Sequence, residues 1–174
     1  MKTLICSISL LALPCLGLAK EKKDAAAAVP DATVSQVQYG TKVNDAPFDK
    51  AQLEGKVVVV EEWGVHCGPC IASLPEMAKL AKTYEKSGLV VVGLERQGGS
   101  KEEITKLIDS AHVKYAVFAG GAAPAASAGI PHACVFNTAG KLVWHGNPLD
   151  ENFQREVRKA LREFKAAPKG LAQL

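Results

Sequence analysis

Two closely spaced cysteines give the sequence its clearest chemical signal: Cys67 and Cys70 enclose Gly68 and Pro69. The motif lies between a run of valines and a helical pattern, so the first sulfur is expected at a helix N-terminus, where unpaired N–H groups and the helix dipole favour a thiolate. A thiolate attacks a disulfide to form a mixed disulfide, and a second thiol one helical turn away then displaces the product. Pro69 stiffens the loop at a position where its missing N–H has no helical partner. The motif predicts thiol–disulfide exchange, with Cys67 attacking and Cys70 resolving.

A structural zinc site and an inert disulfide are the two other uses of such a cysteine pair. A zinc site usually has a second Cys-x-x-Cys or a paired His motif at suitable spacing, and the sequence has neither. The position of the motif between a strand and a helix favours redox chemistry over an inert disulfide. We therefore expect no metal and no other cofactor at this pair.

The N-terminus has the three-part pattern of a secretory signal. Residues 1–19 contain Lys2, an apolar run from Leu4 to Leu18, and small residues at Gly17 and Ala19. The run is about 15 residues long, shorter than the ~20 that a membrane-spanning helix needs. We expect cleavage and a periplasmic or otherwise extracytoplasmic protein, and the alternative is an uncleaved signal that anchors the chain in the membrane.

The cysteine count bears on the redox state of the mature protein. Of five cysteines, Cys6 and Cys15 lie in the expected signal, where a lipid on Cys15 would be a further means of anchoring. Cleavage leaves Cys67, Cys70 and Cys134, and an odd number in an exported protein favours a thiol whose state can change. Cys134 is interpreted as a buried inert thiol or, alternatively, as a regulatory partner of the active site.

The composition, 48% hydrophobic and 22% charged over 174 residues, is that of one soluble domain. The net charge of +3 is spread along the chain without a block of five Lys or Arg, so no nucleic-acid partner is expected, and we expect a monomer. Residues 20–36 are charged and then Ala-rich, which predicts a flexible tether. Residues 37–168 are expected to form the folded domain.

Strand and helix patterns alternate through this domain. Val57–Val60 is a continuous β-branched run, typical of a strand buried on both faces. Apolar residues then recur every three or four positions up to Gly88, which predicts a helix that Pro75 should kink. Strand, helix, strand and helix imply a parallel core and an α/β fold. The further expected elements are a strand at Leu89–Leu94, a helix from the capping box Ser100–Glu103 to Ala111, a strand at Tyr115–Phe118, a small-residue connection at Ala119–Gly129, a hairpin at His132–Asn137 and Leu142–His145, and a last helix with Asn147 as N-cap and Pro148 at its first position.

The segment VVVEEWGVHCGPC, residues 58–70, resembles the strand and active-site turn of thioredoxin, and Ile130-Pro131 resembles its cis-proline loop. The signal, the tether, the segment FDKAQLEGK (48–56) and Pro75 are closer to the extracytoplasmic TlpA-like branch of the thioredoxin superfamily, which includes the reductants of cytochrome c maturation. The resemblance implies a thioredoxin-like fold, with a central mixed β-sheet flanked by α-helices. It also implies a cis Pro131 against the two sulfurs and an Ile130 backbone that holds an extended substrate peptide.

Glu61 stands six residues before Cys67, where this family often has a buried Asp that takes a proton from the second cysteine. A carboxyl on a strand covered on both faces should have a raised pKa, which suits it to accept that proton. The alternative is a solvated acid on an edge strand, because Glu62 beside it must point the other way and the family usually has an apolar residue there.

Two histidines depart from the family pattern. His66 stands where Trp is common, and His132 follows Pro131 where Thr is frequent, so in this fold both imidazoles are expected near the sulfurs. A protonated His66 would stabilise the Cys67 thiolate and make the disulfide more oxidising. Alternatively, both are partly exposed loop residues, or they join Cys67 and Cys70 in a soft site for zinc or copper.

The sequence thus predicts an exported thiol–disulfide oxidoreductase that reduces or exchanges disulfides in exported proteins, apocytochrome c being one candidate. It would need a membrane or soluble electron donor. The alternative is a metal-binding thioredoxin-like module. Trp63 either contacts the active site or packs in the core. The expected catalytic residues are Cys67, Cys70, Glu61 and Pro131, and the expected substrate-contacting residues are Trp63, His66, Gly68, Pro69 and Ile130.

Overall fold

The computed structural model describes residues 29–125 and 127–166. The expected signal with Cys6 and Cys15, and the first part of the expected tether, lie outside these residues. Within the described residues, no helix combines the length and the apolar character needed to cross a membrane.

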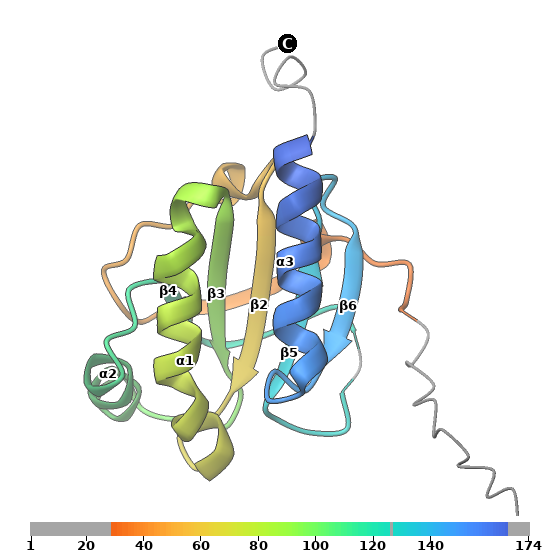
Figure 1. Ribbon diagram of the computed structural model, residues 1–174. Coiled ribbons are helices and arrows are strands. Elements are labelled where there is room, and N and C mark those ends of the chain that lie inside the picture. The colour runs from red at the N-terminus through yellow and green to blue at the C-terminus, as the bar shows by residue number, and fades with distance from the viewer. Residues whose placement is uncertain (1–28, 126, 167–174) are drawn as a thin grey trace, which may run out of the picture.

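Six strands form one mixed sheet in the order β1-β4-β3-β2-β5-β6 (Figure 1). The central strand β2 runs parallel to β3 and antiparallel to β5, and β3 runs parallel to β4. The outer strands β1 and β6 pair antiparallel with β4 and β5. The strands are β1 (Gln38–Lys42), β2 (Val57–Trp63), β3 (Leu89–Glu95), β4 (Ala116–Ala122), β5 (His132–Phe136) and β6 (Leu142–Gly146).

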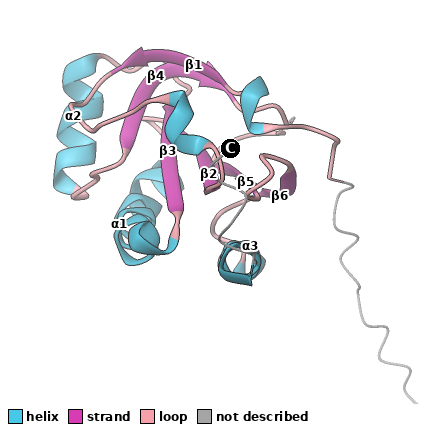
Figure 2. Cartoon of the chain, turned by 90° about the horizontal axis from the view of Figure 1, so that it is seen from above, coloured by secondary structure: helices cyan, strands magenta, loops and turns pink. Residues whose placement is uncertain are grey.

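Three helices pack on one core, which lies on one face of the sheet. They are α1 (Gly68–Tyr84), α2 (Lys101–Ser110) and α3 (Glu151–Ala166). Alternate β2 residues such as Val57 and Val59 contribute to this core together with Leu74 of α1, Ile104 of α2 and Phe153 of α3. Figure 2 shows α1 and α3 side by side below the sheet. The crossovers β2–α1–β3 and β3–α2–β4 place parallel strands next to each other, as the alternating pattern in the sequence predicts.

The opposite face of the sheet is covered by the N-terminal segment, which includes the short 3-10 helices Val34–Gln36 and Lys50–Leu53. Ala32 and Leu53 pack there against Val58 and Val60 of β2. The Leu142 N–H donates to the Ala32 carbonyl at 2.8 Å. Residues 32–36, which the sequence assigns to the tether, therefore contact the domain.

Strand β4 continues through Ala122, so the prediction of a small-residue connection from Ala119 was wrong in its first part. The small residues there permit the close approach of β1. A Cβ at Gly40 would lie 1.9 Å from the Ala119 carbonyl oxygen, and one at Gly121 would lie 2.4 Å from the Gln38 oxygen. The Ala and Gly content therefore belongs to a paired strand.

The last helix begins at Glu151, four residues after its predicted N-cap. Asn147 closes a turn before the helix, because its Oδ1 accepts the Leu149 N–H at 2.9 Å and its carbonyl accepts the Asp150 N–H at 3.0 Å. The predicted cap at Asn147 was thus wrong, although the residue does make an Asn-type turn.

Candidate active site

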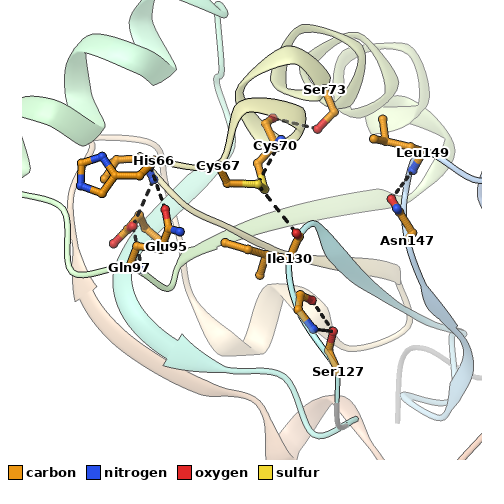
Figure 3. Close-up of a disulfide and its surroundings, with 12 residues drawn as sticks. His66, Cys67, Cys70, Ser73, Glu95, Gln97, Ser127, Ile130, Asn147 and Leu149 are labelled. Atoms are coloured by element: carbon orange, nitrogen blue, oxygen red, sulfur yellow. Dashed lines mark hydrogen bonds between the residues drawn. A yellow bond between two sulfur atoms is a disulfide. The ribbon is translucent and has the colours of Figure 1, made fainter.

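The cysteine pair lies where β2 ends and α1 begins, and the two sulfurs form a disulfide (Figure 3). Cys67 is the N-cap of α1, and its Sγ accepts the Cys70 N–H at 3.3 Å. A helix N-terminus stabilises negative charge, so this position favours a thiolate on Cys67 once the disulfide is reduced. Cys67 keeps 9% of its surface exposed and Cys70 none, so Cys67 is the sulfur that a partner can reach.

The Ile130–Pro131 loop faces this disulfide. The peptide bond between the two residues is cis. The Ile130 carbonyl oxygen lies 3.8 Å from Cys67 Sγ, and both loop residues are partly exposed. The loop therefore forms one wall beside the more accessible sulfur.

Glu61 is completely buried in the middle strand of the sheet. Burial raises the pKa of its carboxyl to about 7, although the hydrogen bond from the Tyr115 hydroxyl at 3.0 Å acts in the opposite direction. Its second oxygen, Oε1, has no hydrogen-bond partner among the described residues. The structure contradicts the alternative of a solvated edge-strand acid and leaves a buried carboxyl that titrates near neutral pH.

His132 is turned away from the dithiol, so the prediction that its imidazole lies near the sulfurs was wrong. Its register partner in the β2–β5 pair is Glu62, so the two side chains share the sheet face opposite α1. The His132 Nδ1–H donates to Glu62 Oε2 at 2.8 Å, and Nε2 lies 3.3 Å from Nδ1 of His145.

His66 is exposed, and Figure 3 shows its ring directed away from the disulfide. The backbone N–H of His66 donates to Gln97 Oε1 at 2.8 Å. His66 is therefore also not placed beside the sulfurs.

The alternative metal site from Cys67, Cys70, His66 and His132 is contradicted by these directions. Among the described residues, no group of three or more His, Cys, Asp or Glu side chains is arranged to hold a metal ion.

Trp63 and Cys134 are both without exposed surface. Trp63 packs in the core shared with the helices, which agrees with the packing interpretation and leaves no surface for substrate contact. Cys134 belongs to the core on the opposite face of the sheet, and burial raises the pKa of its thiol to about 12. Its placement agrees with an inert thiol and not with pairing to the active site.

Glu95 is a buried residue of the site that the sequence analysis missed. Its Oε1 accepts N–H groups from Val65 and Gln97, and its Oε2 accepts those of Gly98 and Gly99, at 2.8 to 3.3 Å. One carboxylate thus fixes the turn that leads into Cys67 to the loop after β3. The sequence signal was an acid at the end of a buried strand, followed by a loop that contains Gly98 and Gly99.

A mixed sheet with a cysteine pair at a strand-to-helix turn, facing a cis-proline loop, defines the class of thioredoxin-like dithiol proteins. The family described as Redoxin matches residues 24–160, and the chain belongs to this family.

The relatives of the chain agree with this class. It is 31% identical over 71 residues to the thiol-disulfide oxidoreductase ResA of Oceanobacillus iheyensis, covering 41% of this chain and 36% of that protein. ResA of Halalkalibacterium halodurans is 37% identical over 43 residues, 25% of this chain and 24% of that protein. The matches thus span well under half the length of both curated relatives.

Solved structures support the fold over a larger part of the chain. A thioredoxin-family thiol:disulfide interchange protein of Chlorobium tepidum has a TM-score of 0.62 and 25% identity, covering 79% of this chain and 99% of that one. A thiol-disulfide isomerase of Corynebacterium glutamicum has a TM-score of 0.63 at 18% identity, covering 81% and 99%, which bears on the fold alone. The predicted superfamily and its α/β fold with a mixed sheet are confirmed, and the chain carries a thioredoxin-like pair of cysteines.

Proposed function

We propose that the chain is an exported thiol–disulfide oxidoreductase that reduces or exchanges disulfides in exported proteins. One observation carries this proposal: Cys67 caps α1 within disulfide-bond reach of Cys70 and is the more exposed of the two sulfurs. Membership in the Redoxin family and the partial match to proteins named thiol-disulfide oxidoreductase support it.

The exchange begins with the reduced protein. The Cys67 thiolate attacks one sulfur of a substrate disulfide, the substrate S–S bond breaks, and the second substrate sulfur leaves as a thiolate that takes up a proton. Cys70 then loses its proton and attacks the Cys67 sulfur, which breaks the mixed disulfide and releases the first substrate sulfur as a thiol. Two electrons pass to the substrate, and the protein reaches the Cys67–Cys70 disulfide seen in the structure. A membrane or soluble dithiol donor must then reduce it again.

Other residues of the site support these steps. Glu61, with a pKa of about 7 and one carboxyl oxygen that has no hydrogen-bond partner in the described part of the chain, suits the role of acceptor for the Cys70 proton. Gly68 and Pro69 are exposed beside Cys67, and the Ile130–Pro131 loop borders it on the other side. Substrate backbone would lie between these two walls.

The signal pattern of residues 1–19 supports export to an extracytoplasmic compartment, with an uncleaved signal or a lipid on Cys15 as means of anchoring. Resemblance to the TlpA-like branch makes apocytochrome c a candidate substrate.

The test is the reduction of insulin disulfides by dithiothreitol, followed as turbidity, with and without the purified protein. We expect acceleration that is absent in Cys67→Ala and retained in Cys134→Ala, which removes the buried thiol of the other core. No acceleration by the wild-type protein would overturn the proposal.

A further inference from the structure

A row of polar side chains on the sheet face opposite α1 has no part in the exchange steps. Arg96 follows β3 directly, and Glu62, His132 and His145 lie on β2, β5 and β6, so three neighbouring strands and the loop after β3 contribute one residue each. Arg96 donates to Glu62 Oε1, the Ala123 N–H donates to the same oxygen at 3.1 Å, and His132 occupies Oε2. Glu62 thereby ties together the loop after β3, the chain after β4 and the strand after the cis proline.

Glu62 and His132 are the two buried members of this cluster, and the cost of burying them calls for an explanation other than stability. Glu62 is 5% exposed and His132 is 3% exposed. Burial would raise the pKa of Glu62, but the bonds from His132 and Ala123 and the charge of Arg96 outweigh it and hold the pKa below its usual value. Glu62 therefore stays ionised, and a buried ion pair adds little net stability over apolar residues of the same size.

The cluster borders a pocket that adjoins the redox site. The pocket has a volume of about 400 Å³, and its lining includes Glu62, Arg96, Gln97, Ala123, Ser127 and Ile130. Ile130 is also the residue whose carbonyl lies 3.8 Å from Cys67 Sγ. Figure 3 shows Ile130 between the disulfide and Ser127, so a polypeptide bound at Cys67 along Ile130 would continue past this pocket.

The side-chain polar groups of the lining that have no partner among the described residues are hydrogen-bond donors. Both Glu62 oxygens are occupied, Gln97 Oε1 accepts the His66 N–H, and the Ser127 hydroxyl donates to the Gly129 carbonyl. Arg96, whose side chain is 37% exposed, uses one guanidinium nitrogen on Glu62 and keeps its other N–H groups unbonded among the described residues. Those groups and the Gln97 amide N–H₂ can bind a ligand with acceptor oxygens, and a carboxylate fits a guanidinium best.

We propose that this pocket is a subsite for a carboxylate of the disulfide-bearing polypeptide, namely an acidic side chain near its reacting cysteine, bound by Arg96 with Gln97. Glu62 is a positioning residue that fixes the guanidinium in place. The inference rests on the proposed oxidoreductase function and adds a preference among its substrates.

The test uses the full chain in its reduced form and short peptides whose single cysteine forms a disulfide with a chromogenic aromatic thiol. Peptide ends are acetylated and amidated, so no terminal carboxylate is present, and Asp or Asn is placed at successive positions on either side of the cysteine. We expect one position at which the Asp peptide reacts about threefold to tenfold faster than the Asn peptide, with a ratio that falls as salt is added. A third series with a free C-terminus distinguishes a side-chain from a terminal carboxylate, and faster reaction of that series alone would overturn the assignment to a side chain.

Two variants locate the effect. Arg96→Gln should bring the Asp-to-Asn ratio to one, whereas Arg155→Gln, which removes an exposed arginine of α3, should leave the ratio unchanged. A ratio of one in the wild-type protein at every position, or an unchanged ratio in Arg96→Gln, would overturn the subsite. Equal reaction of all peptides refutes only the subsite, whereas no reaction with any peptide refutes the oxidoreductase function itself. The wild-type ratio and its salt dependence decide the question even where a variant folds poorly.

Discussion

Replacement of Glu61 by Gln should make the stability of the protein less sensitive to pH. The folded chain keeps the Glu61 proton up to a pKa of about 7, whereas the unfolded chain releases it near 4.5. Between these values the folded state binds more protons, so the free energy of unfolding falls as the pH rises through this window, and the loss is complete above about pH 7. The amide introduced by Glu61→Gln has no such proton to lose and still offers an oxygen to the Tyr115 hydroxyl.

The magnitude follows from the difference between 4.5 and about 7, which is about 2.5, and from ~1.36 kcal/mol for each pKa unit. The variant should therefore gain about 3 kcal/mol relative to wild type between about pH 4 and about pH 8. The group is fully buried, so solvent screening does not reduce this value.

The assay is urea unfolding of both proteins at the two pH values, with the disulfide kept oxidised so that Cys70 does not titrate. Comparison of the two proteins at each pH cancels the titration of all other groups. Glu76→Gln, at an exposed glutamate of α1, serves as the matched control and should show no such gain. The same difference in unfolding free energy at both pH values would refute a raised pKa for Glu61.

Three further predictions concern other residues of the site. Cys70→Ser should trap a mixed disulfide between Cys67 and a protein substrate, visible by non-reducing electrophoresis, because the resolving thiol is missing; rapid release would contradict the assignment of Cys70. Cys134 should not react with an aromatic disulfide reagent near neutral pH until the protein is unfolded, since burial raises the pKa of its thiol to about 12, and fast labelling of the folded protein would contradict its placement. Glu95→Gln should lower the free energy of unfolding by about 2 kcal/mol and speed amide exchange in the turn before Cys67, because one carboxylate oxygen is replaced by an amide group that cannot accept the partly buried N–H groups; wild-type exchange rates would refute the role of Glu95 in fixing this turn.

The sequence predicted the parts of the site that depend on local patterns. The valine run, the Cys-x-x-Cys motif and the apolar period after it specify β2, the turn and α1 without reference to the rest of the chain. The burial of Glu61 was expected from the same strand, because side chains on both faces of a strand that is covered on both sides are shielded from solvent.

The misses arose where the structure depends on contacts between distant segments. Strand β1 is mostly exposed, so its sequence has no alternation of apolar and polar residues that would predict a strand. It forms because β4 pairs with it. The direction of His132 depends on the β2–β5 register, which pairs it with Glu62, and no local pattern specifies that register. Glu95 binds N–H groups of two loops that only the fold brings together.

The measurement that tests the central claim most directly is a redox titration of the protein against glutathione or dithiothreitol buffers. We predict a single reversible two-electron couple with a potential between about −270 and about −120 mV, lost in Cys67→Ser and in Cys70→Ser and unchanged in Cys134→Ala. A disulfide that does not cycle at any accessible potential, or a couple that survives the loss of either active-site cysteine, would contradict the account.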